Sequence, residues 1–417
     1  MKKHFIPALV LTSILAVLTA ASSSAVSGPR PAPGSATLAI PLAVRVYDGN
    51  TFVPDLTLKD FTVLEAGFAV EPTALLCVNK ETIVRQEGIM DVLPNPARQI
   101  TLLFRMSDYN NKVAEGLDAF FKTGLLPGDT LEIQTPMKSY KLSPDRLASK
   151  PRDVLAKELS TLIRKDIVQG GMAYNSLMRD LKRIVRQIGS TQGGWPGRTG
   201  LDDTEADTDD GSSLEMRLMN YTDSLQKMES LRVLSEDGLV SFASRLKSQP
   251  GQKFVYYFFQ REFRPEIGSN AIDQLVMANQ DRPDILAGIQ TVFQMYSRSI
   301  TLDHQRLKEA FADSGAHFNF LFMNKQPEKI SGVVMREQSE DIFKALSTIA
   351  QATGGIADTS QNPAASFKTT LKESENYYIL YFRPASAAPP GTFMDLSVKV
   401  KSRDYRVVHR AGYLTGS

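Results

Sequence analysis

The chain has 417 residues, of which 42% are hydrophobic and 23% are charged, a composition that excludes an intrinsically disordered protein. The length favours two domains over a single core. The 48 basic and 46 acidic residues give a formal net charge of +2, and this balance gives no reason to expect nucleic acid or an anionic membrane as a partner.

The N-terminus has the pattern of a signal peptide. A basic pair precedes an apolar segment, residues 5–18, and small residues follow. We assign residues 1–25 to the signal peptide, with cleavage after Ala21 or Ala25, and the Pro/Gly-rich residues 26–35 to a linker. The apolar segment is shorter than the ~20 residues that a spanning helix needs. We therefore expect an exported chain, periplasmic or extracellular, with no integral membrane segment after cleavage.

Residues 36–95 have the pattern of β-structure. Branched residues are frequent over 37–47, and further strands are predicted at 58–64 and 68–78. Cys77, the only cysteine, excludes a disulfide within the chain, and its apolar neighbours predict a buried core residue instead of a reactive thiol. A few short strands cannot bury a core alone, so we expect them to pair with strands elsewhere in the chain.

The most informative segment is residues 99–110, QITLLFRMSDYN. Its apolar run, residues 100–104, is unbroken, which predicts a strand buried on both faces, as in a parallel sheet. A helical pattern follows at 112–123. The polar residues between them are then at the carboxyl end of the strand, where open α/β sheets bind their ligands.

Strands and helices alternate through residues 96–375. This alternation predicts an α/β domain with a central, mostly parallel sheet and helices on both faces. Strands are expected at 130–134, 253–259 and 317–323, and helices at 153–165, 173–188, 214–247, 271–298, 302–312, 339–353 and 363–374.

Residues 190–213 interrupt this pattern. The segment is rich in glycine and carries six acidic residues between positions 202 and 210. We predict a solvated, flexible insertion. A calcium-binding loop over 202–210 is the alternative, because closely spaced carboxylates suit a hard cation.

The last part of the chain, residues 376–417, returns to β-structure. Strands are predicted at 377–382, 393–400 and 405–409. The simplest arrangement pairs them with residues 36–95 in a β-sandwich domain beside the α/β domain.

Four groups of residues give the chain a resemblance to the exported bacterial VWFA-related proteins, which carry a von Willebrand factor A-type domain. Together the groups extend over nearly the whole chain after the signal peptide. The resemblance implies a Rossmann-like A-type domain that binds partners, usually proteins, through a divalent ion at the top of its sheet. The groups are residues 46–48 with 53–57 and 60–63; 100–110 with Pro127-Gly128-Asp129; 251–259; and 352–355 with 377–381 and 410–413.

The metal ligands that the family implies are not retained here. The family pattern Asp-x-Ser-x-Ser falls on residues 105–109, where only Ser107 matches. Met172 replaces a threonine, and Gln260 replaces an aspartate. Magnesium needs hard oxygen ligands including carboxylate, and Arg105 would place a fixed positive charge about where the ion would lie. We predict a degenerate metal-ion-dependent adhesion site with no metal and no cofactor.

The sequence contains no recognisable catalytic set. The histidines have no cysteine or second histidine at metal-ligand spacing, and neither a Gly-x-Ser-x-Gly elbow nor a P-loop is present. Asp108 and Glu262 could pair as acid and base. At a sheet edge, structural ion pairs of these carboxylates with Arg105 or Arg261 are the more common arrangement. We therefore expect a protein that is not an enzyme.

The leading hypothesis is a non-catalytic binding module that mediates protein–protein interaction or adhesion through the metal-free top face of the A-type domain. The expected surface mixes Arg, Tyr and Met, residue types that are enriched at interfaces. It consists of Arg105, Ser107, Asp108, Tyr109, Asn110, Met172, Gln260, Arg261 and Glu262.

Several alternatives stay open. The same residues could merely fill a vestigial site, with binding on the acidic insertion or the β-sandwich. Asp108, offset by one position, could be the ligand of a displaced metal site that assists adhesion. The chain could also be a hydrolase that uses surface carboxylates, or a structural envelope protein without a dedicated ligand.

Overall fold

The computed structural model describes residues 39–89, 94–190, 213–385, 388–401 and 404–416. All described residues belong to one compact unit, which begins at Thr37. The predicted signal peptide, the linker and residues 191–212 of the predicted insertion, including the calcium alternative, lie outside the described residues.

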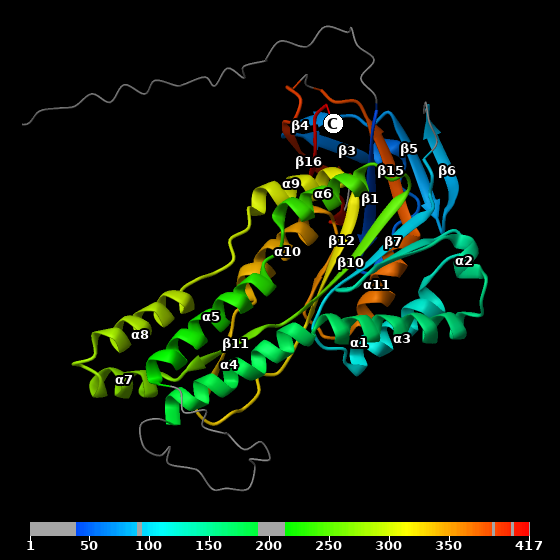
Figure 1. Cartoon of the computed structure of the whole chain (residues 1–417). Coiled ribbons are helices and arrows are strands. Elements are labelled where there is room, and N and C mark those ends of the chain that lie inside the picture. The colour runs from blue at the N-terminus through cyan, green and yellow to red at the C-terminus, as the bar shows by residue number, and fades with distance from the viewer. Residues whose placement is uncertain (1–38, 90–93, 191–212, 386–387, 402–403, 417) are drawn as a thin grey trace, which may run out of the picture. The chain divides into compact units, whose positions relative to one another are not determined.

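A six-stranded, mostly parallel sheet forms one part of the described structure (Figure 1). Its strand order is β14-β12-β10-β7-β8-β9, and only the edge strand β9 runs antiparallel to its neighbour. The predicted mostly parallel sheet is confirmed. The strands are β7 (Arg98–Arg105), β8 (Thr130–Gln134), β9 (Ser139–Leu142), β10 (Gln252–Gln260), β12 (Ala316–Met323) and β14 (Ala357–Asp358).

Helices cover both faces of this sheet. Side chains alternate between the faces along β10, so that Tyr256 packs in one apolar core and Tyr257 in the other. Burial on both faces explains why the central strands read as unbroken apolar runs. The first face is covered by α1 (Asn111–Ala119), the π-helical turn η2 (Phe120–Gly124), α2 (Pro144–Ala148), α3 (Arg152–Gly170) and α11 (Pro363–Glu375), and the second by α6 (Glu236–Lys247), α9 (His304–Ser314) and α10 (Glu340–Ala352).

Strands from the two ends of the chain form antiparallel sheets with a shared apolar core. The predicted pairing of N-terminal with C-terminal strands is confirmed, because the C-terminal strand β15 lies between the N-terminal strands β1 and β5. Cys77 is buried in this core, as expected. One sheet has the order β17-β1-β15-β5-β6 with β2 beside β1, and the other has β18-β16-β3-β4. The strands are β1 (Ile40–Asp48), β2 (Thr51–Phe52), β3 (Phe61–Glu65), β4 (Phe68–Val70), β5 (Ala74–Asn79), β6 (Thr82–Gly88), β15 (Asn376–Phe382), β16 (Phe393–Val400), β17 (Arg406–Val408) and β18 (Gly412–Leu414).

Two predicted β-segments differ in detail from the structure. The predicted strand 58–64 begins as a 3₁₀ turn, η1 (Leu58–Asp60), because Asp60 accepts a hydrogen bond from the backbone N–H of Thr57. The predicted strand 68–78 is divided into β4 and β5, which pair in different sheets.

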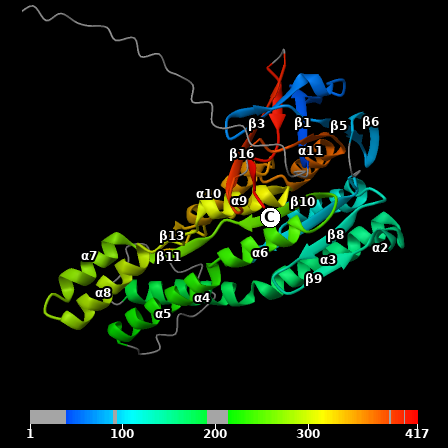
Figure 2. The same cartoon turned by 90° about the horizontal axis from the view of Figure 1, so that it is seen from above.

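A further group of helices has an apolar core of its own, built on a two-stranded antiparallel ribbon. Figure 1 and Figure 2 both show it extending away from the antiparallel sheets. The helix predicted over 271–298 is divided into two, because Pro283 begins a new helix. The group consists of α4 (Met172–Ser190), α5 (Leu214–Arg232), α7 (Ser269–Ala278), α8 (Pro283–Tyr296), β11 (Phe263–Ile267) and β13 (Val333–Glu337).

In the part of the chain that the structure describes, no helix combines the length and the apolar character needed to cross a membrane.

Candidate functional site

Three separate segments meet at the carboxyl edge of the parallel sheet: the loop after β7, the turn between α3 and α4, and the end of β10. The side-chain amide of Asn175 donates to the carbonyl of Ser107 over 3.4 Å. A Cβ atom on Gly171 would lie only 2.4 Å from the same carbonyl oxygen. Glycine is therefore needed for the turn to approach the loop this closely.

Gln260 is the centre of the polar contacts at this edge. Its side chain is buried (5% exposed). Its Oε1 accepts hydrogen bonds from the backbone N–H of Ser107 at 3.1 Å, from the Ser107 hydroxyl at 3.2 Å and from the backbone N–H of Asp108 at 3.1 Å. Its Nε2 donates to Oδ2 of Asp108 over 3.2 Å. A single amide thus holds the loop after β7 in place.

The positive charge beside Asp108 comes from Lys325. Its ammonium forms an ion pair with Oδ2 of Asp108. Lys325 was not among the predicted site residues, because the segment around it has no helical or strand pattern. Its position just after the strand Ala316–Met323 was the available signal, since the carboxyl ends of parallel strands share one edge of a sheet.

Arg105 lies elsewhere than expected. Its Nη2 donates to the carbonyls of Leu231 and Val233, over 2.8 and 3.3 Å, at the end of α5. The last carbonyls of a helix lack partners within the helix and carry its partial negative charge, so they attract a guanidinium. The expectation that Arg105 fills the ion position is corrected: it caps a helix, and Lys325 supplies the charge beside Asp108.

The ion pairs expected for Glu262 also differ. Glu262 pairs with Nε of Arg232 at 2.6 Å, and the same guanidinium reaches Asp341 at 3.0 Å. Arg261 pairs with Glu337 at 2.9 Å. Burial raises the pKa of Glu262, and the nearby Arg232 opposes this rise. Neither Arg105 nor Arg261 is thus the ion-pair partner of Glu262, because α5 brings Arg232 to Glu262 and β13 brings Glu337 to Arg261.

The remaining predicted residues have separate surroundings. Asn110 is the N-cap of α1, since its Oδ1 accepts a hydrogen bond from the N–H of Val113 at 3.0 Å. Tyr109 packs against the apolar core on the α3 face of the sheet, and burial raises the pKa of its hydroxyl. Met172 is 65% exposed at the start of α4. The structure therefore joins Ser107, Asp108 and Gln260 in one network, and the other six predicted residues have other contacts.

Exposed apolar side chains lie next to this polar network, on elements that the network joins. Val168 and Met172 are exposed on the two sides of the α3–α4 turn. Met137 is exposed as well, and its neighbour Pro136 packs against the same turn, since a Cβ atom on Gly170 would lie 2.4 Å from Pro136. We call Met137, Val168 and Met172 the apolar flank. Of these residues, only Met172 was among the predicted site residues.

Among the described residues, no group of three or more His, Cys, Asp or Glu side chains is arranged to hold a metal ion. The absence of metal at the top face stays a prediction, which the titration described below tests.

Comparison of the chain with protein-family models, with curated proteins and with solved structures gives no match. The structure defines the class as a mixed α/β protein with added antiparallel sheets. The family is an expectation that rests on the residues alone.

Proposed function

We propose that the chain is an exported, non-catalytic binding module, similar to von Willebrand factor A-type domains, that docks a protein partner at the carboxyl edge of its parallel sheet without a metal ion. The observation that carries the proposal is the network of Gln260, Asp108 and Lys325. An amide and an ammonium occupy the edge at which the family would hold a divalent cation.

The proposed surface combines polar and apolar contacts. The side chains of Asp108 and Lys325 are 39% and 28% exposed, so each can still reach a partner. The apolar flank is on and next to the α3–α4 turn, whose Gly171 approaches Ser107, and it offers Met137, Val168 and Met172 for burial. A hydrogen-bonding centre next to exposed methionines suits a protein partner, because flexible thioethers adapt to an apolar surface.

A capture experiment tests the proposed surface. The chain without its predicted signal peptide is immobilised, incubated with envelope and secreted proteins, and the retained proteins are quantified by mass spectrometry. We expect Met172→Asp to reduce capture of a specific partner at least about tenfold, since burying a carboxylate in an apolar contact is costly. The matched control is Met277→Asp, which alters a methionine of similar exposure on α7.

The comparison of Met172→Asp with the control Met277→Asp decides whether the proposed surface binds the partner. A partner that is retained by Met277→Asp and lost by Met172→Asp supports the proposal. Equal capture by the wild type and both variants would place binding elsewhere on the chain.

Titration with metal ions tests the metal-free character of the site. We predict no binding heat when magnesium, manganese or calcium chloride is added to the mature chain in a calorimeter, because Lys325 already neutralises Asp108. Tight binding that Ser107→Ala abolishes would contradict this prediction.

A further inference from the structure

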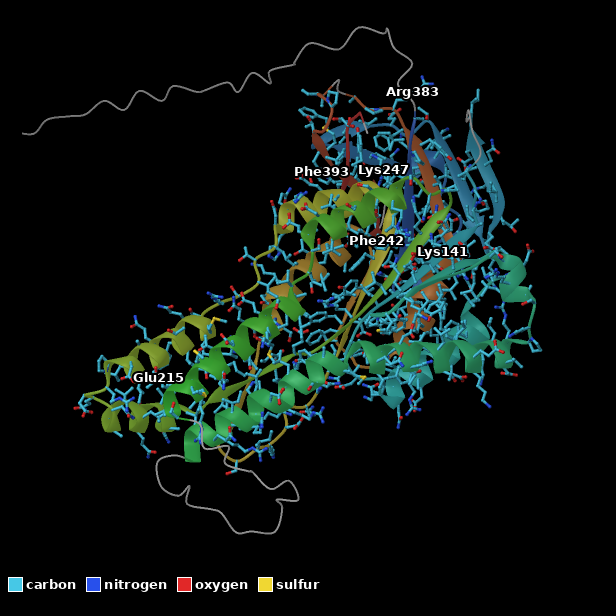
Figure 3. The ribbon with its side chains drawn as sticks, in the orientation of Figure 1. Lys141, Glu215, Phe242, Lys247, Arg383 and Phe393 are labelled. Atoms are coloured by element: carbon cyan, nitrogen blue, oxygen red, sulfur yellow. The ribbon has the colours of Figure 1, made fainter. Side chains whose placement is uncertain are left out.

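A pocket of about 890 Å³ lies at the opposite, amino edge of the parallel sheet. Its walls come from the first residues of β10 and β12, from the end of α6, from β1 and from the C-terminal residues 410–416. Lys247, labelled in Figure 3, belongs to this wall at the end of α6. The volume is in the range of small-molecule sites.

Positive charge dominates the lining of this pocket. Lys247, Lys253 and Arg410 line it together with the neutral ring of His317, and Asp313 is the one acidic residue among its described lining residues. Asp313 is already engaged, since it pairs with Lys247 at 2.7 Å and accepts a hydrogen bond from the N–H of Leu414. The lining therefore keeps an excess of positive charge.

The cations other than Lys247 are held by neutral groups. Lys253, which is 8% exposed, donates to the carbonyl of Gln249 over 3.2 Å. Arg410 donates to the carbonyls of Asp313 and Pro41 over 3.3 and 3.2 Å. No carboxylate of the described residues forms an ion pair with Lys253 or Arg410 in the structure. Arg410 is half-buried and feels the charge of Asp313, whereas Lys253 is buried. A buried ammonium without a counter-ion is costly, and an anion in the pocket would reduce this cost.

His317 adds an unsatisfied polar atom to the same wall. Its side chain is 4% exposed, and its Nε2 has no hydrogen-bond partner. Its Nδ1 lies 3.1 Å from the carbonyl of Thr353 and 3.3 Å from a guanidinium nitrogen of the buried Arg45. Nε2 has no partner in either tautomer. It can donate to an anion in the tautomer in which Nδ1 accepts from Arg45 and Nε2 carries the proton. Such a buried atom in a pocket wall is the position that a ligand group would satisfy.

The pKa values of Lys253 and His317 are both shifted in the direction expected for a buried, positively charged pocket. Burial and the charges of Arg410 and Lys247 lower the pKa of Lys253 to about 8. Burial and the charge of Arg45 lower the pKa of His317. Both groups would hold a proton more firmly if a negative charge entered the pocket.

We propose that this pocket binds a small organic anion, whose carboxylate or phosphate group contacts Lys253, His317 and Arg410. The apolar part of the ligand packs against Ile40, Ile379 and Leu414, which line the same pocket. Charge-assisted hydrogen bonds from an ammonium and a guanidinium hold the anionic group, and the apolar wall selects an organic molecule over an inorganic ion.

Calorimetric titration of the mature chain tests the site. The probes are hexanoate, hexyl phosphate, inorganic phosphate and the neutral hexanamide, each at low ionic strength and pH 7. We expect at least one of the two organic anions, hexanoate or hexyl phosphate, to bind, and the one that binds identifies the preferred anionic group. We expect the neutral hexanamide not to bind. Inorganic phosphate is expected to bind at least about tenfold more weakly than hexyl phosphate, because it buries no apolar surface.

Two variants of the full mature chain make this test specific. We expect Lys253→Met to weaken binding at least about tenfold, since it removes a charge-assisted contact. Arg383→Gln, an exposed position just after β15 that does not line the pocket, is the charge-matched control and should bind like the wild type. Failure of both organic anions to bind, or unchanged binding by Lys253→Met, would overturn the proposal.

A second measurement is made on the wild-type chain, and the variant serves only to assign one signal. The lysines of the wild-type chain are reductively methylated with ¹³C, and the signal that is missing from Lys253→Met is followed by NMR as the pH is changed. We expect its midpoint near pH 8 to rise by about one pH unit or more when the anion is bound. The charged groups that line the pocket with Lys253 are Lys247, Asp313, His317 and Arg410. A midpoint that does not move under saturating anion would overturn the assignment of Lys253.

Discussion

Arg98 and Asp129 form an ion pair that is almost fully buried, with exposures of 2% and 0%. Two guanidinium nitrogens of Arg98 contact the two carboxylate oxygens at 2.8 and 2.6 Å. The guanidinium also donates to the Ser374 hydroxyl and the Gly124 carbonyl, and the carboxylate accepts from the N–H of Leu126. The pair therefore fastens β7, the turn before β8 and the end of α11 to one another.

We predict that Asp129→Ala lowers the free energy of unfolding by about 3–5 kcal/mol, because it leaves the buried guanidinium without a counter-ion. Urea unfolding followed by circular dichroism measures the change. The control is Asp118→Ala, which breaks an exposed, solvent-screened pair with Lys122 and should change the free energy of unfolding far less than Asp129→Ala does. Equal costs for the two variants would contradict the burial of Arg98 and Asp129.

Lys253 has an effect on stability as well as on the proposed binding. Its pKa is lowered from 10.5 to about 8 in the folded chain. Between these pH values the unfolded chain binds more protons than the folded chain, so the free energy of unfolding rises as the pH rises from about 8 to 10.5. Below pH 8 the buried ammonium destabilises the fold.

We therefore predict that Lys253→Met stabilises the free protein at pH 7 by about 1–3 kcal/mol and removes most of this rise at alkaline pH. Urea unfolding at pH 7 and pH 10 measures both effects. Lys344→Met, which removes an exposed lysine on α10, should change stability by less than about 0.5 kcal/mol. Destabilisation by Lys253→Met at pH 7 would show that its ammonium has a counter-ion in solution.

At the scale of elements, the C-terminal end of α5 is capped by a side chain from the strand β7. Arg105, the last residue of β7, donates to two carbonyls there. Because these carbonyls have no partner within α5, the contact joins the parallel sheet to the helical group that contains α5.

We predict that Arg105→Ala costs about 1 kcal/mol of stability and speeds backbone hydrogen exchange in the last turn of α5. Hydrogen exchange followed by mass spectrometry measures the local effect. Arg105→Lys keeps the charge but loses the planar guanidinium, and should lie between the wild type and Arg105→Ala. Faster exchange throughout the chain in Arg105→Ala would contradict a local capping role.

At the scale of the whole molecule, backbone hydrogen bonds join the antiparallel sheets to the elements that cover the parallel sheet. The N–H of Ala411 donates to the carbonyl of Ala352 at 2.7 Å, and the N–H of Lys80 donates to the carbonyl of Glu375 at 2.8 Å. Arg45 of β1 reaches His317 of β12 as well. The two parts of the described structure thus share polar contacts that neither could satisfy alone.

We predict that the antiparallel sheets and the parallel sheet unfold in one cooperative transition, since separating them would leave buried polar groups without partners. Differential scanning calorimetry and hydrogen exchange of β15 and β10 over a urea series measure this. Two resolved heat-absorption peaks, or clearly different urea midpoints for β15 and β10, would contradict the prediction.

Much of the fold could be predicted from local residue patterns. The apolar runs in β7, β10 and β12 identify strands because both faces of each strand are buried, so that no polar alternation obscures the signal. The ribbon of β11 and β13 was not predicted. β11 contains Pro265, which cannot donate to a ladder, and its pairing with β13 is between residues far apart in the sequence.

The candidate sites could be predicted only in part. Ser107, Asp108 and Gln260 were found because polar residues at the carboxyl ends of parallel strands share one edge, a rule that depends on strand order alone. The direction of the Arg105 side chain and the role of Lys325 depend on which neighbouring group is nearest, and no residue pattern contains that information.

The sequence by itself determined the strands and helices whose burial leaves a local pattern, the pairing of the two ends of the chain, and the polar edge of the sheet. Only the tertiary structure decided which charge lies beside Asp108 and that Lys253, His317 and Arg410 line one pocket with an excess of positive charge. The physical reason is the sequence separation over which each effect acts. Propensity and periodicity act over a few neighbouring residues, whereas desolvation and ion pairing act between side chains that only folding brings together.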